Sequence, residues 1–300
     1  MGYEQGKTTA GVKNGGLGMD TASFTLSAVE DLGGGMKAMG SISAGGLARG
    51  NSVGGEDASL TLSGNFGTFA LRTFEAAGSG MTGRASAGAP AYNLHNRVFG
   101  ANANIDGVFY TMPKFGDVTV GLNYVDRGET LLVPTGLAKG TTGLTGGQPS
   151  MGVSVAYAVG AIDAAMDYTS WTRKDDASVA GGDSTKNSVS DRFRIMGNYN
   201  LGIAKIGAGF TQTNRTGVLP VTKETLFGFS APLGAVTVGA TFGESKGDAT
   251  SATTKKSGYT LGMQYDLSKR TNLGVSTFNW KTAGTAGTNT GSRILLGHSF

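Results

Sequence analysis

Apolar residues alternate with small or polar residues over several stretches of the chain. In residues 235–242 the even positions hold Val236, Val238, Ala240 and Phe242, whereas the odd positions hold alanine, threonine and glycine. An alternation with a period of two residues places every second side chain on the same face of a β-strand. The pattern therefore predicts a strand with one apolar face.

The same alternation recurs in five further segments. They lie at residues 118–124, 151–157, 193–199, 259–265 and 294–300. Each extends to about ten residues, which matches the length that a tilted membrane-spanning strand needs and exceeds that of a usual soluble strand. Several segments end in an aromatic residue, as is typical of a membrane–water interface. Their length and pattern favour strands that cross a membrane.

Short and long connections alternate between the strands. Seven short, turn-rich links lie at residues 31–35, 65–67, 113–117, 159–160, 200–202, 232–234 and 266–270. Eight longer polar links lie near residues 15–20, 49–54, 77–100, 127–149, 173–188, 214–221, 246–255 and 282–289. Together they make fifteen connections, which separate sixteen strands. The sequence therefore predicts an all-β protein: a closed transmembrane antiparallel β-barrel with short periplasmic turns and long extracellular loops.

Composition is consistent with a single barrel domain over residues 1–300. The 52 glycines are spread along the chain, charged residues make up only 15%, and no linker divides the chain into halves. No apolar run approaches the roughly 18 residues of a spanning helix, which excludes a helical membrane protein. The absence of cysteine excludes disulfide scaffolds and thiolate metal sites.

Charge and motifs point away from nucleic acid binding and catalysis. The net charge is +4, but lysine and arginine are scattered rather than clustered, so we expect no nucleic acid partner. The only imidazoles are His95 and His298, and no GxSxG, HExxH or phosphate-binding loop is present. We expect no enzyme, no metal and no cofactor. No positively charged, apolar leader precedes the first strand, so we expect either a cytoplasmic chain or a mature one whose signal peptide has been removed.

Several turn motifs occur in one order along the chain. They are EDLGGGMKA at residues 30–38, LSGNFG at 62–67, YTMPKFG at 110–116, YDLSKRT at 265–271 and GHSF at 297–300. This set resembles the general porins of betaproteobacteria, which are trimeric, sixteen-stranded diffusion channels. The resemblance implies an outer-membrane homotrimer in lipid that passes small hydrophilic solutes and ions. It also implies that the third long loop, residues 77–100, folds inward and narrows the pore.

Three parts of the chain depart from that family. The second strand of the family carries arginines, but residues 22–28 (ASFTLSA) carry none. After residues 65–67 only Arg72 remains of a basic pair. The first strand of the family is not recognisable in residues 1–14, but we still expect residues 7–14 to pair with the final strand and close the barrel. At the other end, Phe300 resembles the C-terminal aromatic signal read by the outer-membrane assembly machinery; the alternative is an ordinary interfacial anchor.

Alternation also predicts which charged side chains face the pore. A charge on the lipid face near the membrane centre costs about 2–4 kcal/mol, so charges within strands are expected to face the lumen. The candidate pore-lining residues are Arg72, Glu75, Arg84, Arg97, Asp163, Asp167, Arg192, Arg194, Lys205 and Arg293. Basic groups predominate, and the third loop holds no acid between Glu75 and Asp106. We therefore expect a weak preference for anions.

Two alternatives remain open. The loss of the arginines fits a porin-derived structural or surface-array protein of the outer membrane that conducts little or nothing. A soluble, secreted β-rich protein would also show alternation and many turns, but it would have shorter strands.

Overall fold

The protein is an all-β fold with one short helix among the residues that the structure, a computed structural model, describes. These are residues 1–46, 54–76, 80–91, 94, 97–100, 103–126, 149–172, 189–215, 221–247 and 254–300. Within these ranges, seventeen strands form one sheet. The strands are β1 (Gly2–Lys7), β2 (Lys13–Gly18), β3 (Phe24–Gly33), β4 (Met36–Gly45), β5 (Gly54–Gly64), β6 (Gly67–Ala76), β7 (Ala103–Thr111), β8 (Val118–Asp126), β9 (Ser150–Val159), β10 (Ile162–Trp171), β11 (Val189–Asn200), β12 (Lys205–Arg215), β13 (Thr222–Leu233), β14 (Val236–Lys246), β15 (Lys255–Asp266), β16 (Thr271–Thr282) and β17 (Asn289–His298), and the helix is α1 (Thr82–Ala85).

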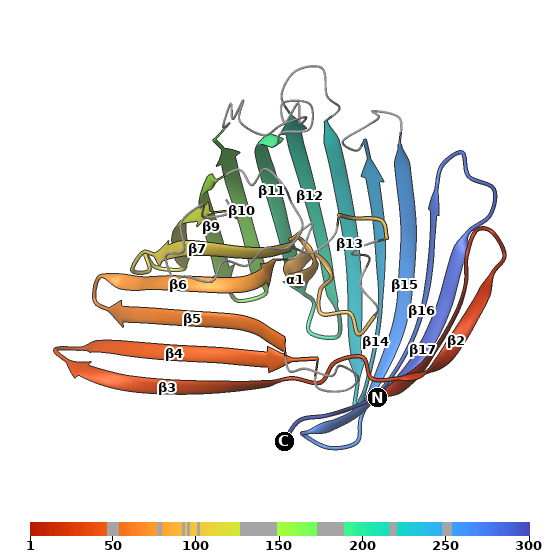
Figure 1. Ribbon diagram of the computed structural model, residues 1–300, viewed down its shortest axis with the longest axis horizontal. Helices are drawn as coiled ribbons and strands as arrows, with labels where there is room; N and C mark the ends of the chain where they lie inside the picture. The colour runs from red at the N-terminus through yellow and green to blue at the C-terminus, as the bar shows by residue number, and fades with distance from the viewer. Residues whose placement is uncertain are drawn as a thin grey trace.

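The sheet is antiparallel throughout. Each strand from β3 to β17 pairs with the next along the chain, as in the run from β10 to β14. β17 then pairs with β1, and β1 pairs with β2. Figure 1 shows the sheet curving around an interior in which α1 lies against β12 and β13. Hydrogen bonds between consecutive strands therefore satisfy most of the backbone, as a membrane requires.

The alternation read from the sequence is confirmed. β8, β9, β11 and β15 cover four of the predicted segments, β14 covers all but the first residue of the segment at 235–242, and β17 ends two residues before the end of the segment at 294–300. On β11 the outward side chains Phe193, Ile195 and Tyr199 are 39%, 48% and 45% exposed. Such a run of exposed apolar side chains is the lipid-facing pattern of a membrane strand. No helix in the described residues is long and apolar enough to cross a membrane.

The count of sixteen strands is wrong, because the start of the chain folds as a hairpin. Thr8 donates its N–H to the carbonyl of Val12 at 2.9 Å, and Gly11 adopts a φ of +83° that favours glycine. The predicted link at 15–20 therefore lies largely within β2. The strand that pairs with β17 is Gly2–Lys7 rather than residues 7–14.

This hairpin leaves β2 and β3 at the two ends of the pairing series, and no register joins them in the described part of the chain. Both run in the same direction, because the strands between them alternate. β1 runs opposite to β3. A closed antiparallel ring needs an even number of strands, because each strand must run opposite to both of its neighbours. β1 therefore has the direction that an antiparallel partner of β3 needs, whereas β2 does not.

The structure describes the predicted long links to different extents. The links at 127–149 and 173–188 fall wholly or almost wholly outside the described residues, as do the centres of those at 49–54, 214–221 and 246–255. The link at 282–289 is confirmed between β16 and β17.

The pairing of β1 with β17 can be tested by a disulfide, because the native chain has no cysteine. Gln5 and Ser292 are directly opposite, and the Gln5 amide donates to the Ser292 hydroxyl at 3.4 Å. Opposed residues have Cβ atoms about 4.5–5.5 Å apart, close to disulfide geometry. We expect Gln5→Cys/Ser292→Cys to cross-link and to migrate faster on non-reducing denaturing gels. The control Gln5→Cys/Ser257→Cys, with its second cysteine on β15, should stay open; a cross-link there as well, or none in the test pair, would contradict the register.

Candidate functional site

The two faces of the sheet differ in what they contact. Met196 of β11 packs against residues of the third loop, such as Met81 and Ala85. Its neighbours Phe193 and Ile195 are exposed on the opposite face of the sheet. We call the face of Met196 the inner face and the opposite one the outer face. Alternation and register then assign every strand residue to one face.

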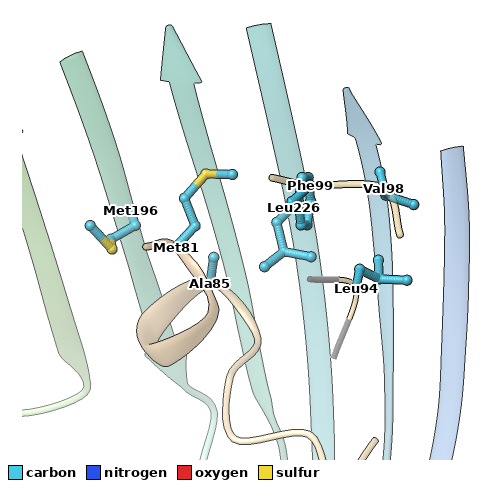
Figure 2. Packing of buried hydrophobic residues seen from close by; sticks show 7 residues of the cluster. All are labelled: Met81, Ala85, Leu94, Val98, Phe99, Met196 and Leu226. Carbon is cyan, nitrogen blue, oxygen red and sulfur yellow. The ribbon is translucent and has the colours of Figure 1, made fainter. Parts of the chain in front are cut away.

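The described part of the third loop runs along the inner face. We call residues 80–91, 94 and 97–100 the inner segment. Figure 2 shows a buried apolar cluster between this segment and the wall strands. Its members are Met81, Ala85, Leu94, Val98, Phe99, Met196 and Leu226, with Ala165 and Trp280 packed against it. Burial of these side chains fixes the loop to one side of the lumen.

Glycines on the inner face allow the loop backbone to approach the wall. A Cβ on Gly207 would lie 2.6 Å from the carbonyl oxygen of Ala85, and one on Gly228 would collide with Ala85 and Ser86. The same holds farther along the inner segment. We call this set the glycine track: Gly207, Gly209, Gly228, Gly239, Gly243, Gly258 and Gly262. Close backbone approach of this kind is a usual reason for glycine within a strand.

Two ion pairs flank the start of the inner segment. Arg84 Nε lies 2.7 Å from Asp163 Oδ1, and both side chains are more than one third exposed, at 35% and 41%. Arg194 Nε lies 2.8 Å from Asp167 Oδ2, with side chains only 17% and 13% exposed. A Cβ on Gly80 would collide with the Arg194 guanidinium. The first pair faces the lumen, and the second is covered by the loop.

A third carboxylate, Glu224, lies behind the inner segment and was not among the predicted site residues. It is 8% exposed and accepts a hydrogen bond from the backbone of Gly100. Arg192, Arg194 and Arg215 are close enough to interact with it electrostatically. Alternation could have found Glu224, because it shares its face with Leu226 and Gly228. A buried carboxylate of this kind is stable only with such partners.

These contacts change the interpretation of Arg192 and Arg194. Both were predicted as pore-lining residues, and both do lie on the inner face of β11. The structure covers Arg194 with the loop, and it places Arg192 with its guanidinium 5.3 Å from the ring centre of Trp171. They therefore contact the loop and the wall more than the open lumen.

The remaining basic candidates lie around the lumen. Lys205 is exposed at the start of β12, opposite Ser230. Arg72 stacks 4.7 Å from the ring centre of Phe74, a cation–π contact that holds it on the inner face of β6. Two others are engaged by neighbours, since Arg97 lies 4.6 Å from the Phe278 ring centre and Arg293 Nη1 lies 3.1 Å from Asp20 Oδ1.

The structure separates the other two candidates from this group. Glu75 shares its face of β6 with the exposed Phe69 and Leu71, so it lies on the outer face and does not join Arg72. Phe300 follows the end of β17 and is fully exposed, with its ring centre 4.8 Å from that of His298. Its role as an assembly signal stays a prediction. His95 lies outside the described residues.

The inner face of β3–β6 carries hydroxyl groups. The hydroxyls of Thr25 and Ser43 lie 2.8 Å apart, as do those of Ser41 and Ser59. Ser59 is opposite Arg72 in the register. We call this surface the hydroxyl wall. It occupies the part of the sequence where the absence of arginine was noted, so Arg72 is the cation that β3–β6 contribute at mid-strand height.

Comparison with known proteins agrees with this architecture. A family model described as Gram-negative porin matches residues 1–282. The anion-selective porin from Comamonas acidovorans is similar in structure, with a TM-score of 0.74, 24% identity, and coverage of 100% of this chain and 96% of that chain. OmpT of Vibrio cholerae in its trimer form has a TM-score of 0.63 at 12% identity over 99% of this chain and 98% of that one.

A mutant of the Rh. blastica porin gives a TM-score of 0.62 at 16% identity, covering 100% of this chain and 98% of that one. No curated protein matches the sequence.

The glycine track predicts that an added methyl group will displace the inner segment. For Gly228→Ala we expect the free energy of unfolding to fall by about 1–3 kcal/mol, because the new Cβ meets backbone atoms that have no room to move. In a Trp171→Phe background the fluorescence of Trp280, which packs on the cluster, should shift to longer wavelength.

The matched control is Gly83→Ala in α1, where a Cβ meets nothing within 4 Å. It should change neither the Trp280 emission nor the unfolding transition. Equal behaviour of the two variants would show that the loop does not rest on the track.

Proposed function

The chain belongs to the Gram-negative porin family, whose members form passive channels in the outer membrane, and we propose that its channel has a weak preference for anions. We also propose that residues 1–300 form one barrel domain without catalytic activity. The hydrophilic path runs between the inner segment and the hydroxyl wall, so both surfaces contact a passing solute. Family membership leaves no support for a soluble secreted protein.

One observation carries the proposed selectivity: the inner-face carboxylates near the loop are paired, whereas two exposed inner-face cations, Lys205 and Arg72, have no such partner among the described residues. Asp163 is bound by Arg84, and Asp167 is bound by Arg194. Glu224 is buried among arginines. By contrast, Lys205 and Arg72 are exposed and form no ion pair with any residue in the described ranges. The field in the lumen is therefore expected to be positive.

The structural relatives support the same assignment. The Comamonas acidovorans porin is described as anion-selective, and it is similar to this chain over its whole length. The low charge of the hydroxyl wall explains why we propose a weak preference. Hydroxyl groups replace water around either sign of ion, so they add little discrimination.

Reversal potentials in a KCl gradient across planar bilayers test the proposal. We expect the native channel to favour chloride. Lys205→Gln and Arg72→Gln should each reduce the chloride-to-potassium permeability ratio by about a factor of two, and Lys205→Glu should favour potassium, because the local potential changes sign.

Lys114→Gln provides the control, since Lys114 is exposed in the short turn between β7 and β8 and is not an inner-face position of a strand. It should leave the ratio unchanged. A native reversal potential that favours potassium would refute anion preference. A folded barrel that inserts without conducting would instead support the structural, surface-array function.

We further propose that three copies assemble through the outer face of β3–β8. A groove of about 850 Å³ lies along these strands, and its lining includes the outer-face residues Ala28, Gly40, Ala58, Leu60 and Leu71. Small residues let a neighbouring surface approach closely within a membrane. OmpT of Vibrio cholerae is described in a trimer form, which supports this occupant.

Gly40→Leu should reduce the trimer fraction, measured by light scattering in detergent. A Cβ at Gly40 meets nothing within 4 Å in its own chain, so the monomer has room for the side chain while a partner does not. Ala240→Leu, on the outer face of β14, is the control and should leave assembly unchanged. If Gly40→Leu remains fully trimeric, the interface lies elsewhere.

A further inference from the structure

Three lysines stand side by side on the outer face, at the strand ends farthest from the short turns. The register sets Lys223 of β13 opposite Lys246 of β14, and Lys246 opposite Lys255 of β15. All three side chains are exposed. We call them the lysine row. Figure 1 shows that β13, β14 and β15 are neighbours in the sheet, so the three residues project from adjacent strands.

The outer-face residues next to the lysine row neutralise only part of its positive charge. Glu244 Oε2 lies 2.8 Å from Lys255 Nζ, with both side chains nearly half exposed. Ser257 pairs with Glu244 on one side and with Lys281 of β16 on the other. Four lysines and one glutamate leave a net charge of +3 on this patch. Like charges directly opposite each other destabilise a sheet, so the arrangement calls for an anionic counterpart.

Aromatic side chains lie directly below on the same face. Phe227, Phe242 and Tyr259 are opposite one another in register, and the rings of Phe242 and Tyr259 are 6.2 Å apart. Aromatic residues of barrel strands mark the edge of the apolar band. The lysine row is two outward positions farther along each strand, about 13 Å at the usual rise per residue. Because barrel strands tilt by about 35–45°, this length is about 9–11 Å along the membrane normal, and a lysine side chain spans much of that distance. The ammonium groups can therefore reach the lipid headgroups.

We propose that the lysine row and Lys281 bind the phosphate groups of anionic lipids in the extracellular leaflet. The aromatic row contacts the upper part of the acyl chains, while the ammonium groups bind the headgroup above it. This combination fits a phosphate that is attached to an apolar tail. A soluble phosphate would use only the lysines, and their side chains are too exposed to hold it strongly.

The site is separate from the channel. The lysine row lies on the outer face, and the residues proposed to set selectivity lie on the inner face. A substitution that abolishes lipid binding is therefore expected to leave conduction unchanged, and the reverse also holds. If either proposal is wrong, the other can still be tested.

Electron spin resonance of labelled lipids tests the proposal. The native protein is reconstituted in phosphatidylcholine bilayers that contain spin-labelled phosphatidic acid or spin-labelled phosphatidylcholine. We expect phosphatidic acid to be enriched at the protein surface, with less enrichment at high salt. Lys223→Gln/Lys246→Gln should reduce the enrichment by about fourfold, because each exposed ion pair contributes a factor of about two.

The matched control is Lys114→Gln/Lys269→Gln, which removes the same charge from exposed positions in the short turns. It should keep the enrichment, and bilayer conductance should be native in both double variants. Equal loss in the control, or no enrichment in the native protein, would overturn the proposal. Displacement of the labelled lipid by an equal concentration of glycerol phosphate would also overturn it, because the tail would then contribute nothing.

Discussion

The close approach of the inner segment to the wall is the contact on which the geometry of the lumen depends. A loop inside a barrel must find hydrogen bonds and apolar contacts in a space otherwise open to water. Here the residues of the glycine track have no side chains that would hold the loop backbone away from the wall. The buried apolar cluster, which includes Met81 and Met196, adds the burial of apolar side chains. Ser230 then donates its hydroxyl hydrogen to the carbonyl of Ala87 at 2.5 Å. The loop thus becomes part of the wall on this side of the lumen.

The fold could be predicted largely from the sequence, because a membrane strand carries its own signal. Every second residue faces lipid, and the alternation in segments such as 193–199 therefore survives regardless of what lies in the lumen. The start of the chain was predicted less well. Its glycine-rich stretch at 11–18 has little alternation to fix a register, and the turn at Gly11 depends on a local backbone conformation that composition does not reveal.

The candidate site could be predicted only by face. Alternation placed Arg192, Arg194, Asp163 and Lys205 on the inner face, which is where the structure has them. It could not distinguish a charge that lines the open path from one that the loop covers, because this depends on where a distant segment docks. Arg194 illustrates the limit: its pairing with Asp167 follows from cross-strand register, but its contact with Gly80 joins positions more than one hundred residues apart in sequence.

Strands β13–β15 show how one register serves two environments. Their inner positions alternate with their outer ones, so Leu226, Gly228 and Ser230 receive the loop while Lys223 and Phe227 face the membrane. A slip of one residue would reverse both faces together, placing phenylalanine under the loop backbone and glycine toward lipid. Each face therefore specifies the register of the other. Loop docking and contact with the membrane are separate functions of these strands, yet both depend on the same strand pairing. A substitution that shifts the pairing is therefore expected to disturb both faces. A substitution that changes a single side chain affects only the face on which that side chain lies.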